Sequence, residues 1–426
     1  MKSIIKEEEE GQEEVKMQSP LLLKRVFSPL KKESEDLLIC FSYALDQKDN
    51  TQVLKELQEQ ILFDPRTRRP KENITIKNYN DGSNYQGQLN GKMREGYGIY
   101  YYKNGDIYAG GWRNDKFQGR GVYLFANGER YEGDLVDGVK QGKGVYYYVN
   151  KNKYLGDWKN GKKHGKGAFY FFSSNEIYDG EWVDGERHGM GTFLFATGDK
   201  FIGNWVKGEK KGIGTIYYSN NSKFEGEWKN NRPNGQGIML YTNGDKYDGN
   251  WVNGVKSSFG KYYYPDGSRY EGEWENDDKE GSGTFYYAKG DHFTGEWKNG
   301  LRNGMGLYEY HDGGSYEGGW LKDFKSGKGV LILADGTKYD GEWENGERNG
   351  FGKLSLPNGE VYEGEFKNDT INGKGRYRWA NGDVYEGGWM QNMMHGEGVL
   401  TNKDGEEFRG IWEYQRLIKN SSPKRV

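Results

Sequence analysis

Hydrophobic and polar residues alternate in short stretches along most of this chain. In the stretch YEGEW a period of two places Tyr270, Gly272 and Trp274 on one face and Glu271 and Glu273 on the other, which is typical of a strand with one buried face. The glycine leaves a gap between the two rings. We expect an aromatic side chain of a neighbouring strand to lie over this gap.

An aromatic residue followed two positions later by glycine recurs fifteen times along the chain. Every interval is 23 residues except the one between Tyr154 and Tyr178, which is 24. A period this strict indicates a repeat architecture. The aromatic positions are Tyr85, Tyr108, Tyr131, Tyr154, Tyr178, Phe201, Phe224, Tyr247, Tyr270, Phe293, Tyr316, Tyr339, Tyr362, Tyr385 and Phe408.

Each repeat is predicted to contain a second strand. After Trp274 a polar loop leads to GSGTFYY, residues 281–287, a β-branched and aromatic run. Asn-Gly pairs close several copies, as at Asn104-Gly105, and form a strong hairpin signal because both residues tolerate positive φ. The sequence therefore predicts an all-β, elongated and twisted antiparallel meander of tandem hairpins. Fourteen full repeats give twenty-eight strands and, at about 4.8 Å per strand, a length of roughly 130 Å.

Some repeats depart from the pattern. Leucine or phenylalanine replaces tryptophan at Leu89, Leu135 and Phe366, and Ser258 replaces the first glycine of a Gly-x-Gly pair. The extra residue of the 24-residue interval falls in FFSSNEI, where we expect a longer loop or a bulge. We interpret these departures as drift, with a bend or a docking site as the alternative.

The two ends of the chain have a different character. Residues 34–63 show two apolar stripes at helical spacing, and Thr51 is the expected N-cap of the second helix. Such a helical pair is expected to cap the first edge strand, with partner docking as the alternative. The predicted organisation is a disordered charged tail at 1–33, the helical pair at 34–63, a linker at 64–73, the repeat array at 74–413 and a C-terminal tail at 414–426.

Composition narrows the class of protein. Hydrophobic residues make up only 34% of the chain, whereas aromatic residues reach 15% and glycine counts 67, so burial is expected from layers of rings. A net charge of -3 gives no electrostatic case for nucleic acid. The single cysteine, the acidic start and the absence of a long apolar run lead us to expect an intracellular protein without a membrane span.

The repeated phrases resemble the MORN repeat (membrane occupation and recognition nexus). The resemblance rests on segments such as FEGEWKN from Phe224 and FTGEWKNGLRNGMG from Phe293, and it covers residues 85 to about 412. It implies an elongated sheet of antiparallel strands. The roles it implies include radial spoke heads of the ciliary axoneme, cytoskeletal scaffolds and membrane-junction proteins, and some members carry a separate catalytic domain beside the repeats.

No catalytic or cofactor-binding constellation stands out in the sequence. The paired glycines lie in repeated β units and lack the strand-to-helix junction of a phosphate-binding loop. His164 and His188 occupy equivalent positions in neighbouring repeats, about 10 Å apart, which is too far for one zinc ion. We therefore predict neither an enzyme nor a bound cofactor or metal.

The leading functional hypothesis is a non-catalytic scaffold that binds structural proteins in a cytoskeletal assembly, with the axonemal radial spoke head as the preferred instance by resemblance. Rings of the mid-array are the predicted protein-contact face, and packing within the sheet is the alternative for them. The second hypothesis is a peripheral membrane module that binds anionic phosphoinositides through lysines, and self-association fits either hypothesis. The predicted contact rings are Trp228, Tyr247, Trp251, Tyr270, Trp274 and Trp297, and the predicted lipid-contact lysines are Lys162, Lys163, Lys210 and Lys211.

Overall fold

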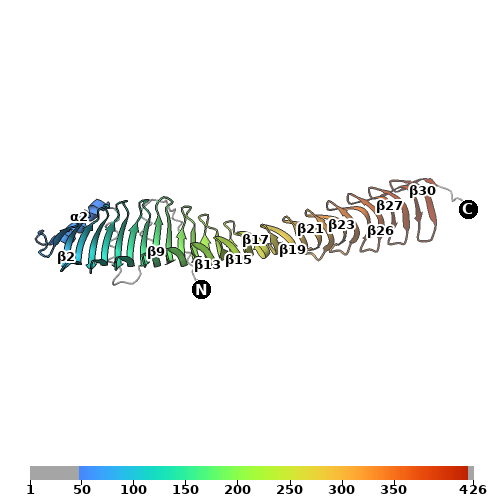
Figure 1. Ribbon diagram of the computed structural model, residues 1–426. Coiled ribbons are helices and arrows are strands. Elements are labelled where there is room, and N and C mark those ends of the chain that lie inside the picture. The colour runs from blue at the N-terminus through green and yellow to red at the C-terminus, as the bar shows by residue number, and fades with distance from the viewer. Residues whose placement is uncertain (1–47, 421–426) are drawn as a thin grey trace, which may run out of the picture. The chain divides into compact units, whose positions relative to one another are not determined.

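The computed structural model describes residues 48–420, which form antiparallel strands and one helix. The chain divides into two units, residues 1–139 and 140–426. Consecutive strands pair with each other within each unit, and β2 to β29 are the twenty-eight strands expected from the fourteen repeats. The predicted all-β antiparallel meander is thus confirmed (Figure 1).

Unit 1 contains the helix α2 (Asn50–Leu62). Its N-cap is Asp49, whose side chain accepts a hydrogen bond from the Gln52 N–H at 2.8 Å. The prediction of Thr51 was wrong because the more strongly capping aspartate stands two residues earlier in an extended conformation. The strands of this unit are β1 (Thr75–Asn78), β2 (Asn84–Asn90), β3 (Met93–Tyr101), β4 (Ile107–Arg113), β5 (Lys116–Leu124) and β6 (Arg130–Val136).

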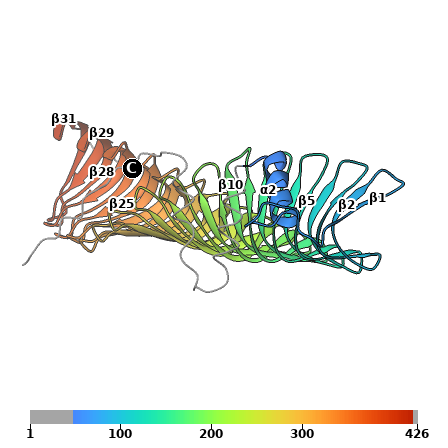
Figure 2. The same cartoon turned by 90° about the vertical axis from the view of Figure 1, so that its left-hand side faces the viewer.

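Helix α2 lies across one face of the first strands of unit 1 (Figure 2). Ile61 and Leu62 form a buried cluster with Ile99 of β3 and Ala109 of β4. The helix thus contacts β2, β3 and β4, whereas β1 pairs only with β2 and forms the start of the sheet in the described chain. The other predicted helix lies outside the described residues.

Unit 2 holds the remaining strands. They follow one another in a row that twists gradually toward the C-terminal end (Figure 1). The last strand lies inside the range assigned to a C-terminal tail, so residues 416–420 belong to the sheet. The strands are β7 (Val139–Tyr147), β8 (Lys153–Lys159), β9 (Lys162–Phe171), β10 (Glu176–Val183), β11 (Glu186–Leu194), β12 (Lys200–Val206), β13 (Glu209–Tyr217), β14 (Lys223–Lys229), β15 (Arg232–Leu240), β16 (Lys246–Val252), β17 (Val255–Tyr263), β18 (Arg269–Glu275), β19 (Asp278–Tyr286), β20 (His292–Lys298), β21 (Leu301–Glu309), β22 (Ser315–Leu321), β23 (Phe324–Ile332), β24 (Lys338–Glu344), β25 (Glu347–Ser355), β26 (Val361–Lys367), β27 (Thr370–Arg378), β28 (Val384–Met390), β29 (Met393–Thr401), β30 (Glu407–Glu413) and β31 (Arg416–Asn420).

Two kinds of turn alternate along the chain. In the five-residue turns that contain an Asn-Gly pair only the glycine has positive φ, for example 90° at Gly244, while the Asn243 side chain accepts a hydrogen bond from the Asp245 N–H at 3.1 Å. The expected positive φ at both residues occurs instead in the two-residue turns after the tryptophans, such as Asn276-Asp277 with φ of 50° and 74°. These two-residue turns have the mirror-image geometry that favours tight hairpins.

The predicted polar loop after each tryptophan is largely a bulged strand. Trp274 pairs with Lys279 and Gly272 pairs with Gly283, so the register shifts between them and the chain bulges near Gly281, whose φ is 62°. Ser258 takes the equivalent position with a φ of 57°, a strained conformation for a residue with a Cβ. The second strand of this repeat, β19, thus begins at Asp278, three residues before the predicted start at residue 281.

The extra residue of the 24-residue interval is absorbed by the strands. β9 has 10 residues and β10 has 8, whereas β7 has 9 and β8 has 7. Phe171 pairs directly with Glu176, so four loop residues lie between them. The prediction of a longer loop or a bulge was wrong, because the inserted residue extends the pairing in continuous register and leaves a loop one residue shorter than the five-residue turn between β15 and β16.

Candidate functional site

One face of unit 2 carries a continuous ladder of aromatic rings. Tyr270 lies 5.3 Å from Trp274 in its own strand and 5.2 Å from Trp297 in the next repeat, both nearly edge to face. Tyr247 makes the same two contacts one repeat earlier, with Trp251 and Trp274. Edge-to-face pairs of this kind each contribute about 0.5–1.5 kcal/mol beyond the area they bury.

Glycines let the backbone approach these rings. A Cβ added at Gly283 would lie 2.6 Å from Cε2 of Tyr270, and one added at Gly272 would lie 2.5 Å from Cα of Gly283. The Tyr270 hydroxyl donates to the Glu273 carbonyl at 3.0 Å, and Trp297 Nε1 donates to the Gly283 carbonyl at 3.0 Å. The ring over the glycine therefore comes from the same strand, whereas a neighbouring strand was expected to supply it.

Basic side chains lie on top of this ladder. In unit 2 the second residue after the two-residue turn is a lysine or arginine in most repeats, and its charged group lies 4.3 to 5.4 Å from the ring at the tryptophan position of the next repeat. We define these side chains as the cation row. Its members are Lys140, Lys163, Arg187, Lys210, Lys256, Lys279, Arg302, Lys325 and Arg348.

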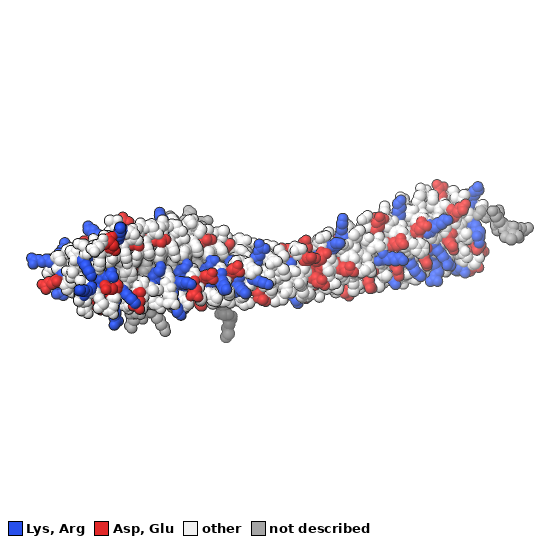
Figure 3. Space-filling model, viewed as in Figure 1, with Lys and Arg blue, Asp and Glu red and all other residues white. Residues whose placement is uncertain are grey.

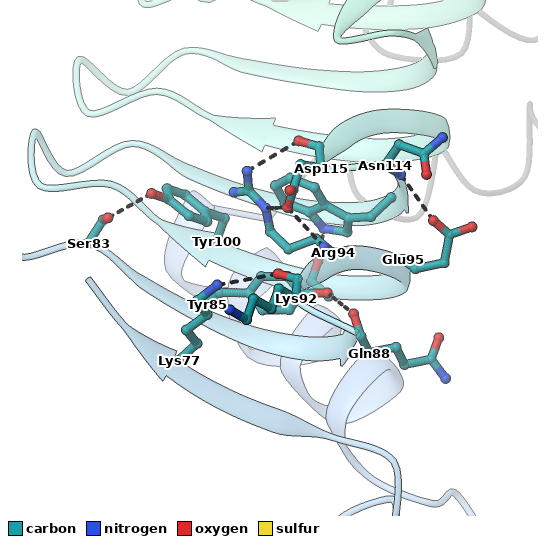
Figure 4. A network of polar contacts seen from close by, with 12 residues as sticks. Lys77, Ser83, Tyr85, Gln88, Lys92, Arg94, Glu95, Tyr100, Asn114 and Asp115 are labelled. Atoms are coloured by element: carbon teal, nitrogen blue, oxygen red, sulfur yellow. Dashed lines mark hydrogen bonds and ion pairs between the residues drawn. The ribbon is translucent and has the colours of Figure 1, made fainter. Parts of the chain in front are cut away.

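An aspartate neutralises some members of the row. Asp323, the second residue of its turn, accepts hydrogen bonds from the Arg302 backbone N–H at 3.0 Å and from Arg302 Nε at 2.9 Å. Asp369 binds Arg348 in the same way, and Asp277 lies 3.8 Å from Lys256. The close-up of unit 1 in Figure 4 shows this geometry for Arg94 and Asp115.

Four lysines of the row have no such partner, and we define them as the unpaired lysines. Among residues 48–420, none places a carboxylate within ion-pair distance of them. Glycine or asparagine occupies the turn position that aspartate holds elsewhere. Burial lowers the pKa of each to about 8, so they remain mostly charged near neutral pH. The unpaired lysines are Lys163, Lys210, Lys279 and Lys325.

A cavity of about 230 Å³ opens beside the first of these lysines. Lys163, Arg187 and Lys207 contribute positive charge to its wall, and Glu186 is the acidic residue that lines it. The apolar part of the wall comes from Phe169, Phe171 and Trp182. The cavity can therefore accept a group that is both anionic and apolar.

The rings predicted as a protein-contact face are buried. Tyr247 and Tyr270 have exposed fractions of 0%, and the four tryptophans Trp228, Trp251, Trp274 and Trp297 lie at 4–6%. Their contacts are those of the alternative interpretation, packing within the sheet. A partner would meet the cation row that covers them.

The four lysines proposed for lipid contact do not share one face. Lys162 and Lys211 are exposed, whereas Lys163 and Lys210 are half-buried over aromatic rings. Figure 3 shows basic and acidic side chains intermixed along unit 2 on the face in view. The cation row was not predicted, although its signal is present in the sequence: a basic residue two positions after the turn recurs at the repeat period in most copies.

No helix within residues 48–420 is long and apolar enough to cross a membrane. In the same range no group of three or more His, Cys, Asp or Glu side chains is arranged to hold a metal ion.

Comparison with family models gives fourteen tandem matches to the MORN repeat. No curated protein matched the chain. The matched residues are 85–107, 108–130, 131–153, 154–176, 178–200, 201–223, 224–246, 247–269, 270–292, 293–315, 316–338, 339–361, 362–384 and 385–407.

Several solved structures are similar to parts of this chain. The TCP10 domain of Danio rerio CPAP, in complex with a peptide of Danio rerio STIL, has 12% identity and a TM-score of 0.31, with 52% of this chain and 93% of that chain covered. The TCP domain of Drosophila melanogaster SAS-4, in complex with a proline-rich motif of Ana2, has 15% identity and a TM-score of 0.20, with 47% and 90% covered.

Proposed function

Because the chain belongs to the MORN repeat family, we propose that it is a non-catalytic interaction scaffold whose array binds other proteins in a cytoskeletal assembly. The repeats suggest the scaffold itself. The observation that carries the binding role is the cation row, in which a basic side chain covers the ring ladder in most repeats of unit 2 and several members form no ion pair with a carboxylate of residues 48–420.

Repetition makes this face suitable for a long partner. Each cation lies at the same place in its repeat, so neighbouring members are separated by two strands, or about 10 Å. A partner that lies along the array meets the same chemistry several times, and many weak contacts of this kind add up to stable binding. An enzyme with an active-site pocket would instead need one unique arrangement of catalytic side chains.

We take the ciliary axoneme, and within it the radial spoke head, as the assembly to test first, on the ground of family resemblance. A tagged copy of the full chain is expressed in ciliated cells, which are then extracted with detergent at moderate salt. Retention on the axoneme supports the proposal. Absence from cilia overturns the axonemal setting.

The same extraction tests the membrane alternative. A phosphoinositide-binding module leaves with the detergent-soluble membrane fraction and binds anionic liposomes in a salt-sensitive way. Replacement of the exposed pair Lys162 and Lys211 by glutamine weakens that binding if lipid is the ligand. Unchanged retention on the insoluble fraction in this variant supports the protein scaffold.

A further inference from the structure

Three successive members of the cation row stand together without acidic partners. Lys163 of β9, Arg187 of β11 and Lys210 of β13 come from consecutive repeats. Within the described part of the chain, no carboxylate forms an ion pair with any of the three. The turn residues that carry aspartate elsewhere are here Gly185, Gly208 and Asn231, whose backbone N–H groups donate to the carbonyls of the three basic residues.

Two carboxylates near the trio accept hydrogen bonds from serines, and a third, that of Glu186, lines the cavity. Asp199 lies near Lys210, but its Oδ1 accepts the Ser219 N–H at 2.7 Å. Glu176 lies near Arg187, and its Oε2 accepts the Ser174 hydroxyl at 2.9 Å. Because no carboxylate lies within ion-pair distance, the positive charge of this trio is less compensated than that of Arg302 or Arg348, each of which has an aspartate at 2.9 Å.

The trio also adjoins apolar surface. Lys163 Nζ lies 4.3 Å from the Trp182 ring and 4.7 Å from the Phe169 ring, and the cavity of about 230 Å³ lies between Lys163 and Arg187. Phe171 contributes a further ring to the cavity wall. The surface therefore places one partly apolar cavity between the charges of Lys163 and Arg187.

The spacing of the trio matches an extended polypeptide. Two strands separate consecutive members, which gives about 10 Å. A segment in the polyproline II conformation has three residues per turn and advances about 3.1 Å per residue, so every third side chain returns to the same face after about 9 Å and meets the next cation. We infer that the surface formed by Lys163, Arg187 and Lys210 binds an extended acidic segment of a partner protein whose carboxylate side chains are three residues apart. This inference rests on the proposed scaffold function in that the ligand is a protein segment.

The chain itself contains glutamates with this spacing. Glu7, Glu10 and Glu13 lie three residues apart in the N-terminal region, outside the described residues. They make the chain's own acidic segment the main competitor for the site. A partner segment in trans is favoured here because the site is one part of an array that presents similar cations over many repeats.

Direct binding to the purified full-length chain tests the inference. The probe is a fluorescent peptide with glutamate at every third position and glycine or serine between, and the control peptide has the same composition with the glutamates contiguous. We expect the spaced peptide to bind at least about tenfold more tightly than the contiguous one. Equal binding of the two peptides would overturn the inference.

The variant K163M/R187M/K210M removes the three charges and keeps side chains that cover the rings. Methionine is compatible with this position, because Met394 occupies it opposite Trp389. We expect the variant to lose at least about tenfold in affinity for the spaced peptide. The control K162Q/K211Q removes two exposed charges from β9 and β13 and should bind as the parent does.

Two other results would contradict the inference, one for the role of the trio and one for a partner segment in trans. Equal loss of affinity in K162Q/K211Q would show that general positive charge, and not the trio, attracts the peptide. Binding that is seen only after Glu7, Glu10 and Glu13 are replaced by glutamine would assign the surface to the chain's own segment. Both outcomes are independent of retention on the axoneme, so the inference and the proposed function can fail separately.

Discussion

The contact between Tyr270 and Gly283 is the sharpest place to perturb the ring ladder. A Cβ at Gly283 would lie 2.5 Å from Cζ and 2.6 Å from Cε2 of Tyr270, and all three nearest atoms belong to that ring. The Tyr270 side chain is fully buried. The substitution Gly283→Ala therefore forces the ring out of its place.

The cost follows from the contacts that the ring would lose. Displacement breaks the edge-to-face contacts with Trp274 and Trp297, at about 1 kcal/mol each. It also breaks the hydrogen bond from the Tyr270 hydroxyl to the Glu273 carbonyl, worth about 1 kcal/mol. We expect Gly283→Ala to lower the local stability by about 3 kcal/mol, the upper part of the range for overpacking.

A double-mutant cycle separates the ring from other causes. Tyr270→Ala alone removes the ring, and in that background Gly283→Ala should cost less than about 1 kcal/mol, since its three nearest neighbours are gone. Gly300→Asn is the matched control. Nothing lies within 4 Å of a Cβ at Gly300, and asparagine already takes the equivalent turn position at Asn231 with a φ of 66°.

Hydrogen exchange read by mass spectrometry is the suitable assay, because a repeat array need not unfold in one step. Amides of β18 and β19 should exchange faster in Gly283→Ala, while those of β24 and β25 should keep their parental rates. Equal costs of Gly283→Ala with and without the Tyr270 ring would refute the reasoning. A large cost of Gly300→Asn would show that loss of any glycine, and not the ring contact, is responsible.

Three further substitutions and one pH profile test the strained bulge and the cation row. Ser258→Gly should raise local stability by about 1 kcal/mol, because glycine adopts positive φ without strain, and increased exchange in β17 would contradict this. Asp323→Asn should cost about 1 kcal/mol through the weaker bond to Arg302, seen as faster exchange in β21. Gly346→Asp should raise the pKa of Lys325 from about 8 toward the usual value for lysine, as measured by NMR titration. An unchanged pKa would refute the idea that an aspartate at the second turn position pairs with the cation of the preceding repeat. The thermal midpoint should rise between about pH 8 and about pH 10, because in this range the unpaired lysines bind more protons in the unfolded state than in the folded state. It should fall above pH 10, because burial raises the pKa of the ladder tyrosines, so the folded state then binds more protons than the unfolded state.

The strands of this protein could be predicted from the sequence because their determinants are local. Alternation of Tyr270, Gly272 and Trp274 with glutamates defines a buried face, and the 23-residue period fixes the number of hairpins. Neither inference depends on a contact between distant segments. The structure confirms both.

The turns and bulges could not be predicted in the same way, since one dipeptide serves two backbone conformations. Asn243-Gly244 has positive φ at the glycine alone, whereas Asn253-Gly254 has positive φ at both residues. The difference follows from the number of residues between the paired strands: five lie between Leu240 and Lys246, and two lie between Val252 and Val255. The pairing register of the strands, which cannot be read from the dipeptide itself, determines the backbone conformation of the turn.

The candidate surface was missed for a related reason. Lys162 and Lys163 are adjacent in sequence, and both were predicted to contact lipid together with Lys210 and Lys211. Within a strand, adjacent residues point to opposite faces, so each pair contributes one exposed lysine and one that lies over a ring. The recurrence, at the repeat period, of the lysine that lies over a ring carried the information, more than the density of lysines did.

The second residue of the two-residue turn affects both the backbone conformation of the hairpin and the charge of the surface. Its backbone must have positive φ, and glycine, asparagine and aspartate all satisfy this requirement in the present chain, as at Gly300, Asn231 and Asp277. Only aspartate also neutralises the cation of the preceding repeat, as Asp323 does for Arg302. A change among these three residues can therefore expose or hide one positive charge at a chosen repeat while the hairpin keeps its geometry. The pattern of charge along the array can thus vary without any change in the rings that hold it together, and this independence makes a repeated hairpin suitable for recognition of an extended partner.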